Sequence, residues 1–465
     1  MDEEQGQSMG IKQPLLAAEP REGSLNIRVT AYGTADGSDT AAAEPLLSPA
    51  GRTRCSRAKA VFNLANTIIG AGMLALPKAY ATLGVVAGTL TLLAICYMTY
   101  ASLIVLIKAA EDSGRCSYAA IVGAKLGTAC SAALRLAIIL NCAGVIVIYM
   151  VVIADSLAGI TEFAAMGPPA GPAPARTVII TVVAWLFVAP LVAPRTMRTL
   201  SHASLLSLSC ACLFCGVTIA LATAAACKGQ LPHIHWLPDR QAFAGSPVRM
   251  IAQALAAVPV ITTAFICHFN IHPVMAELKN YSHGRMRQVV QRSLGFCAAT
   301  YIAVPVAAYM LFGDQTHGDV ISNFTPAALG KLVAAPLAQA LVLAVRSTNV
   351  LSLWLSMPML MFPLRAEVFT LLKQGTQPSN TVFFGVTYVL LGLCYVLAVF
   401  VTSMWTAASL VGATSGIMLA FLFPALIMIR ADPCRSCCSW RKLCAWGMFG
   451  LGCVLAVAGV ASNFH

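Results

Sequence analysis

The residues best suited to bind a small ligand lie in Phe62–Pro77, within the first long apolar segment of the chain. Gly70 and Gly72 each cost about 1 kcal/mol relative to Ala in a helix interior, and Pro77 removes a backbone donor. In a bilayer, backbone groups freed by such a break are tolerated only where they line a cavity or are buried in protein. The start of a half-helix can bind an anion, and unwound carbonyls can bind a cation. Glycines also let membrane helices pack closely, so glycine content alone leaves both interpretations open.

A second interrupted segment, Val258–Val274, lies five apolar segments further along the chain. It contains five residues that are uncommon inside a membrane helix: Pro259, His268, Asn270, His272 and Pro273. Many secondary transporters consist of two inverted repeats with a broken helix at the same place in each. We therefore predict two five-helix repeats, at about 60–226 and 250–429. Their paired breaks indicate transport of a solute.

The composition of the 465-residue chain is that of a membrane protein. It is 58% hydrophobic and 10% charged, whereas soluble proteins carry about 25% charged residues; the mean hydropathy is +0.78. The net charge of +12 does not indicate a nucleic-acid partner, because the basic residues lie in short loops where they report orientation. Most of the 17 cysteines lie in apolar runs, so they predict neither a disulfide framework nor a metal site.

Eleven apolar segments have about the 20 residues that a bilayer span needs. We expect the spans at about 60–80, 84–109, 127–158, 177–195, 199–226, 250–276, 289–312, 331–362, 381–402, 405–429 and 443–462. Lys and Arg are more frequent in one set of alternate loops, the set on the same side as the N-terminus. By the positive-inside rule this side is the cytosol. With an odd number of spans, the C-terminus then lies outside or in a lumen. The predicted organisation is a disordered cytosolic tail at 1–56, a transporter core at 57–430, and a cytosolic loop with the eleventh helix at 431–465.

Four of these segments carry recognisable motifs. They are Asn66–Leu74 in the first; Ala264–His268, Pro273 and Glu277–Lys279 in the sixth; Val345–Arg346, Ser356–Pro358 and Phe362–Arg365 in the eighth; and Gly412–Gly416 with Phe423–Leu426 in the tenth. Together they resemble the amino acid/auxin permease family, in particular its sodium-coupled neutral amino acid transporters and their vacuolar plant and algal relatives. The resemblance implies an all-α integral membrane fold of eleven transmembrane helices. It also implies a 5+5 inverted repeat with discontinuous helices one and six.

An amino acid zwitterion needs hydrogen-bond donors for its carboxylate and acceptors for its ammonium group. Backbone N–H groups of the first break can supply the donors, since glycine allows close approach, and carbonyls of the second break can supply the acceptors. The expected substrate-binding residues are Gly70, Ala71, Gly72, Phe265, Cys267 and His268. Neither break contains Asp, Glu, Lys or Arg at its centre, which favours neutral amino acids.

The coupling ion is left open between sodium and a proton, and no other cofactor is expected. The resemblance implies a sodium site between the first and eighth helices, made of Asn66, main-chain carbonyls such as that of Ile69, and Ser356. The Ser356 hydroxyl could equally bond back to its own helix. Proton coupling would instead use His268 or His272, because imidazole titrates near neutral pH.

Arg346 lies within the predicted eighth span, where a charge costs about 2.5–3.5 kcal/mol and needs a partner or a water-filled path. It could be a gating or coupling charge, or it could extend its side chain to the membrane surface. Relatives carry Arg here across differing substrates, so we expect gating or a scaffold role. Asp155 could pair with a basic group that the sequence does not identify. Tyr149 and Asn141 could face the site or serve in packing.

We therefore expect an ion-coupled secondary transporter of neutral amino acids, working by alternating access in a vacuolar, lysosomal or plasma membrane. Its expected partners are the amino acid and the lipid bilayer. No phosphate-binding loop and no nucleophile–base pair points to an enzyme. An alternative is an endomembrane amino acid sensor with little or no transport, whose ligand exposes the tail to a partner. An ion channel is a third hypothesis, although no repeated polar pore lining is present.

Overall fold

The computed structural model describes residues 55–164, 172–195, 201–238, 247–373, 378–431 and 440–463. Within these ranges every regular element is a helix, and the one β contact is an isolated bridge between Cys55 and Leu278. Nine of the described helices are long and apolar enough to cross a membrane, or ten if a bent pair counts as one span. The described part of the chain is thus an all-helical, multi-pass membrane protein. Apart from its last two residues, the predicted tail at 1–56 lies outside the described residues.

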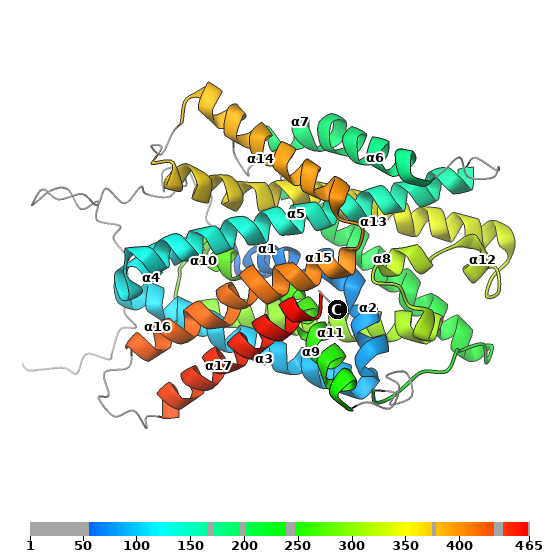
Figure 1. The fold of residues 1–465 in the computed structure, drawn as a ribbon, viewed down its shortest axis with the longest axis horizontal. Helices are drawn as coiled ribbons and strands as arrows, with labels where there is room; N and C mark the ends of the chain where they lie inside the picture. Colours follow the sequence, from blue (N-terminus) through cyan, green and yellow to red (C-terminus); the bar gives the residue numbers. More distant parts are fainter. Residues whose placement is uncertain are drawn as a thin grey trace, which may run out of the picture. The chain divides into compact units, whose positions relative to one another are not determined.

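The helices and their connections appear in Figure 1. In chain order they are α1 (Arg57–Ile68), α2 (Gly72–Leu83), α3 (Val85–Ser113), α4 (Tyr118–Leu126), α5 (Thr128–Ala164), α6 (Pro172–Val182), the π-helix η1 (Val183–Val188), α7 (Ala189–Val192), α8 (Ser201–Cys227), α9 (Pro247–Ala264), the 3-10 helix η3 (His268–Asn270), α10 (Ile271–Glu277), α11 (His283–Phe312), the 3-10 helices η4 (Gly313–Gln315) and η5 (Val320–Asn323), α12 (Pro326–Leu329), α13 (Ala335–Leu371), α14 (Asn380–Phe400), α15 (Met404–Val411), the π-helices η6 (Gly412–Gly416) and η7 (Met418–Leu422), α16 (Phe423–Ala431) and α17 (Trp440–Ala461). Each predicted span has a helical counterpart.

The fourth predicted span, 177–195, corresponds to α6, η1 and α7, which together run from Pro172 to Val192. Their apolar part is the helix Arg176–Val192. At 1.5 Å per residue this apolar part is about 26 Å long, whereas the hydrocarbon core is about 30 Å thick. The count of eleven transmembrane helices therefore remains a prediction.

The two longest helices, α5 and α13, each contain 37 residues and pack against each other (Figure 1). Near one end, Arg135 of α5 pairs with Glu367 of α13 at 2.5 Å. Near the other end, Arg346 of α13 donates to the carbonyl of Ser156 at 3.3 Å. A Cβ added at Gly159 would lie 1.8 Å from the Arg346 guanidinium. Only glycine at this position lets the arginine lie across α5.

One end of the long helices, called the α4 end after the helix that lies there in Figure 1, joins the start of α1 to two distant loops. The Cys55 N–H donates to the carbonyl of Glu277 at 2.8 Å, and the Lys279 N–H donates to that of Cys55 at 3.0 Å. The Tyr281 hydroxyl donates to the Glu111 carboxylate at the end of α3 at 2.5 Å. These loops belong to the set that the charge pattern assigns to the N-terminal side.

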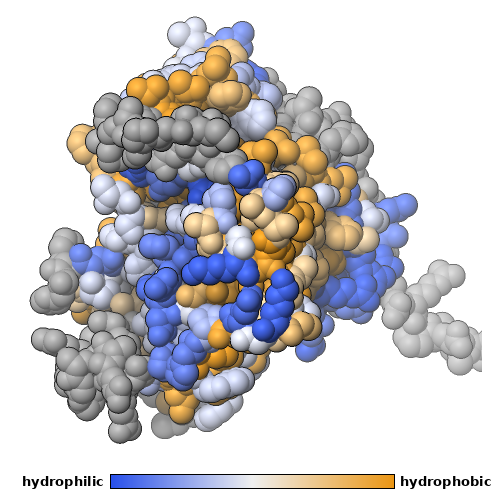
Figure 2. Space-filling model, turned by 90° about the vertical axis from the view of Figure 1, so that its right-hand side faces the viewer, coloured by the Kyte–Doolittle hydropathy of each residue, from blue (hydrophilic) through white to orange (hydrophobic). Residues whose placement is uncertain are grey.

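The opposite end, called the α12 end, joins the other set of alternate loops. The Val85 N–H donates to the carbonyl of His235 at 3.0 Å. Arg176 of α6 donates to the carbonyl of Val401 at 2.9 Å and pairs with Asp155 at 2.8 Å, which identifies the partner that the sequence leaves open. Figure 2 views this end and shows hydrophilic residues gathered near the middle of the face, beside apolar ones. The predicted topology assigns these loops to the side opposite the N-terminus.

Candidate functional site

The first predicted break separates α1 from α2. Residues 69–71 lie between the two helices, whose axes are bent by 59°. The N–H groups of Met73 and Leu74 donate to the carbonyls of Gly70 and Ala71, at 3.1 and 2.9 Å, in the short pattern that tightens a helix start. The first N–H groups of a helix have no acceptor within that helix, so this break presents donors to a ligand.

The second break separates α9 from η3. Residues 265–267 have no helical structure, and the Phe265 N–H donates to the carbonyl of Thr262 at 3.0 Å. The two breaks are in direct contact. A Cβ added at Gly72 would lie 2.7 Å from the Cα of Ala264. The absence of a side chain at Gly72 therefore lets the start of α2 lie against the end of α9.

Tyr301 of α11 connects the two breaks, and it is fully buried. Its hydroxyl lies 2.6 Å from the carbonyl oxygen of Ile68, at the end of α1, and 3.2 Å from that of Ala264, at the end of α9. A hydroxyl has one proton, so it donates to one of these carbonyls at a time. The ring also packs edge-on against Phe265, with centroids 5.2 Å apart. Sequence reasoning missed this residue because no local break or charge marks it.

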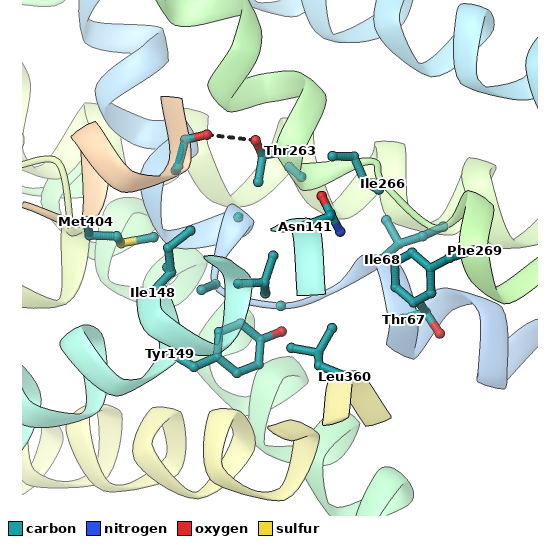
Figure 3. Close-up of a pocket in the computed structure, with 16 residues that line it drawn as sticks. Thr67, Ile68, Asn141, Ile148, Tyr149, Thr263, Ile266, Phe269, Leu360 and Met404 are labelled. Atoms are coloured by element: carbon teal, nitrogen blue, oxygen red, sulfur yellow. Dashed lines mark hydrogen bonds between the residues drawn. The ribbon is translucent and has the colours of Figure 1, made fainter. Parts of the chain in front are cut away.

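A cavity of about 30 Å³ lies beside the first break (Figure 3). All of its lining residues are uncharged: Thr67, Ile68, Gly70, Ala71, Gly72, Asn141, Val145, Ile148, Tyr149, Thr263, Ala264, Ile266, Phe269, Leu360, Met404 and Ala408. This volume holds about two water molecules. An amino acid needs more room than the cavity offers in this conformation.

Two polar side chains of α5 reach this cavity. Asn141 is 1% exposed, and its Oδ1 has no hydrogen-bond partner among the described residues. The Tyr149 hydroxyl points toward the break (Figure 3), and a Cβ added at Gly70 would lie 2.2 Å from it. Thr263 is engaged elsewhere, since its hydroxyl lies 2.8 Å from the carbonyl oxygen of Ala408. The Oδ1 of Asn141 is thus an unsatisfied polar atom on the lining, and the Tyr149 hydroxyl lies beside the glycines and interacts with the backbone of Ala71.

Three of the predicted binding residues, Phe265, Cys267 and His268, are buried but do not line this cavity. The Nε2 of His268 lies 2.7 Å from the Ser102 hydroxyl of α3. The other ring nitrogen of His268 and both of His272 are buried without a hydrogen-bond partner among the described residues. The prediction for the second break concerns main-chain carbonyls, so it does not require these side chains to face the cavity.

The predicted sodium ligands lie along the contact between α1 and α13. The Asn66 amide nitrogen lies 3.1 Å from the sulfur of Met359, one turn beyond Ser356, and its Oδ1 is buried with no described hydrogen-bond partner. The Ser356 hydroxyl donates to the carbonyl of Ser352 at 2.9 Å and lies 2.8 Å from the hydroxyl of Ser207. Ser356 thus makes the bond back to its own helix that the sequence left as an alternative. Among the proposed sodium ligands, the side-chain oxygen of Asn66 lacks a described hydrogen-bond partner.

Comparison with known proteins identifies the family of this chain. Residues 53–464 match the family model described as transmembrane amino acid transporter protein. The chain belongs to this family. It is 31% identical over 413 residues to "Amino acid transporter AVT6E" of Arabidopsis thaliana, covering 87% of this chain and 82% of that protein. It is 32% identical over 381 residues to "Amino acid transporter AVT6A" of the same plant, covering 80% of each. The molecule is a transporter and not an enzyme.

Arg346 of this transporter lies away from the cavity and is 6% exposed. Its guanidinium donates to the carbonyl of Phe324 at 3.3 Å as well as to that of Ser156. These bonds join α13, α5 and the segment after η5 near the α12 end. These contacts do not include the cavity lining, and a gating or scaffold role for Arg346 stays a prediction.

Proposed function

We propose that the protein is an ion-coupled secondary transporter that moves neutral amino acids by alternating access. The observation that carries this proposal is the uncharged cavity at the first break. A cationic or anionic side chain buried there would lack a counter-charge, which makes its transfer from water costly. The family supports the amino acid as substrate.

The amino acid binds across the two breaks. Its carboxylate accepts hydrogen bonds from N–H groups around Gly70–Gly72, where the positive end of the α2 dipole adds to the attraction. Its ammonium group donates to carbonyls of residues 265–267 and to the free Oδ1 of Asn141. This assignment rests on eleven membrane helices in two inverted repeats, with α1–α2 and α9–α10 as the discontinuous helices one and six.

Transport requires the cavity to widen, because about 30 Å³ does not accommodate an amino acid. Rotation of α1 relative to α2 about residues 69–71 would enlarge the site and open it toward one side. Binding would then favour closure around the substrate, and a second rearrangement would release it on the other side. We place the N-terminus in the cytosol and the transporter in a vacuolar, lysosomal or plasma membrane.

The coupling ion is sodium or a proton. A sodium ion would be held by Asn66, the Ile69 carbonyl and Ser356, and the buried unpaired oxygen of Asn66 suits a hard cation. A proton would instead be carried by His268 or His272, which have buried ring nitrogens without described partners. No observation on the described residues favours the alternative of a non-transporting sensor.

Uptake of labelled glutamine into proteoliposomes tests the proposal, with a sodium gradient and a proton gradient imposed separately. Excess unlabelled neutral amino acids should compete, whereas lysine and glutamate should not. Asn66→Ala should abolish sodium-driven uptake, and Asn63→Ala, one turn earlier on α1, is the control. Equal competition by charged amino acids would contradict neutral selectivity. Absence of uptake under both gradients would contradict transport itself.

A further inference from the structure

A buried carboxyl group lies at the α12 end, in the connection between α11 and α13. Asp319 is 8% exposed. Its Oδ1 accepts the N–H of Ile321 at 3.0 Å and so caps the start of η5. Its Oδ2 is buried and has no hydrogen-bond partner among the described residues. A carboxylate in this position leaves a charged oxygen unsatisfied, whereas a protonated carboxyl is neutral.

The charges around Asp319 do not compensate for this burial. Asp155 of α5 is the nearby acid and is already paired with Arg176 at 2.8 Å. Arg346 of α13 is the nearby base, and its guanidinium bonds to the carbonyls of Phe324 and Ser156. The titratable groups of α2, the remaining packed helix, are Lys78 and Tyr80, and the Tyr80 hydroxyl accepts a hydrogen bond from Thr89 at 3.3 Å.

Burial is the main influence on this carboxyl, and it raises the pKa of Asp319 to about 7. The hydrogen bond from the Ile321 N–H lowers the pKa, the charge of Asp155 raises it, and that of Arg346 lowers it. Asp319 lies outside the membrane spans, between His283–Gln315 and Ala335–Leu371. The compartment at the α12 end is therefore the source of its proton in the proposal below.

The element that Asp319 caps is in contact with the helices that frame the cavity. η5 packs against both α2 and α5. α2 begins at Gly72 beside the cavity, and α5 carries Asn141 and Tyr149 on its lining. A change of charge at Asp319 thus acts on the two helices that would move during transport.

We propose that the Asp319 carboxyl binds a proton from the compartment at the α12 end and that this proton holds η5 against α2 and α5. When the proton leaves, the carboxylate is charged in a site that solvates it poorly, which favours movement of η5 toward water and opening of this end. The link to the cavity rests on the proposed transport function, whereas the proton site does not.

Thermal unfolding of the purified full-length protein tests the proton site without transport. Asp319→Asn keeps the shape and stays neutral, and Asp314→Asn, an exposed aspartate of the same connection, is the control. A carboxyl whose pKa is raised on folding stabilises the protein below its unfolded pKa of about 4 and loses this contribution as pH rises through the folded pKa. The Tm of the wild type should therefore fall relative to that of Asp319→Asn between about pH 4 and about pH 7, and Asp314→Asn should follow the wild type. Parallel Tm profiles of wild type and Asp319→Asn would overturn the proton site.

Transport with pH varied only at the α12 end tests the link to the cavity. Wild-type flux should change at least about threefold between about pH 5 and about pH 8, and Asp319→Asn should keep the low-pH flux throughout. An equal pH response in both proteins would overturn the link while leaving amino acid transport established. If no variant transported any amino acid, the proposed function would fail and the Tm profiles would still decide the proton site.

Discussion

At the scale of single residues, the glycines of the first break have no room for a side chain. A Cβ on Gly72 would lie 2.7 Å from the backbone of Ala264, which cannot rotate away, whereas one on Gly70 would meet the mobile end of Tyr149 at 2.2 Å. We expect Gly72→Ala to reduce flux at least about tenfold, equivalent to about 1.4 kcal/mol. Gly70→Ala should reduce flux less, because the Tyr149 ring can shift.

Flux per inserted protein in proteoliposomes measures both effects. Gly385→Ala in α14 is the matched control, because an added Cβ there meets no atom within 4 Å. This control should keep wild-type flux, and better helix propensity should leave its stability unchanged or slightly higher. Wild-type flux in Gly72→Ala would show that α2 and α9 are not held in this close contact during transport.

A second prediction at this scale concerns Tyr301, whose hydroxyl lies within hydrogen-bond distance of a carbonyl at the end of α1 and of one at the end of α9. Tyr301→Phe preserves the ring contact with Phe265 but removes the one proton that the two buried carbonyls share, and an unsatisfied buried polar group costs about 1–3 kcal/mol. We expect a lower Tm and at least about tenfold lower flux. Tyr97→Phe, at an exposed position of α3, is the control. An unchanged flux in Tyr301→Phe would exclude a role for this bridge.

The residues that could be predicted from the sequence are those with a local signal. Gly70 and Gly72 interrupt a helix pattern, and the structure places both on the cavity lining. Tyr301 has no such signal, since its role comes from the position of α11 against two distant chain segments. For Asn141 the sequence allows two roles, in the site or in packing, because a helix pattern alone does not fix which face meets a cavity. These distinctions depend on tertiary contacts that no local spacing encodes.

At the scale of elements, buried Arg365 joins α13 to the end of α7. It is 2% exposed and donates to the carbonyls of Val192 at 2.8 Å and Pro194 at 3.3 Å. Lysine keeps the charge but cannot reproduce this forked geometry. Because a hydrogen bond to a charged group contributes about 1.5–3 kcal/mol, Arg365→Lys should lower the Tm by several degrees.

Thermal unfolding in one detergent measures this loss, with Arg287→Lys as the control. Arg287 is exposed, and its guanidinium donates to the Tyr100 hydroxyl at 2.9 Å. This control should leave the Tm close to that of the wild type, because exposed contacts contribute little. A Tm for Arg365→Lys equal to that of Arg287→Lys would mean that the α7–α13 junction does not limit stability.

Helical elements were largely predictable, because apolar runs of bilayer length and paired breaks are local properties. The third and eighth predicted spans, 127–158 and 331–362, are the longest of the eleven, and α5 and α13, which correspond to them, each contain 37 residues. The helix type and the end of the fourth span were less predictable. Its middle is the π-helix Val183–Val188, and the described helix ends three residues before the predicted span does. Such local changes of winding depend on packing and not on hydropathy alone.

At the scale of the whole described chain, the short helix α6–η1–α7 decides the topology. Near one end of it, Arg176 pairs with Asp155 near the α12 end of α5. Its other end, at the Val192 carbonyl, accepts from Arg365, two residues from the ion-paired Glu367 at the α4 end. Although its apolar part, Arg176–Val192, is only about 26 Å long, the helix extends from one end of the α5–α13 pair toward the other. We therefore expect it to cross the membrane.

Two native cysteines test this crossing. Cys116 follows α3 and Cys227 ends α8, and both are exposed. Between them lie α5, the short helix and α8, so three crossings place the two thiols on opposite sides of the membrane. In sealed vesicles, a membrane-impermeant maleimide should label one before permeabilisation and the other only after it. Cys116→Ser and Cys227→Ser identify the two signals by their loss. Labelling of both thiols from one side would mean that the short helix is not a span, which would also remove the odd helix count and the inverted repeats that depend on it.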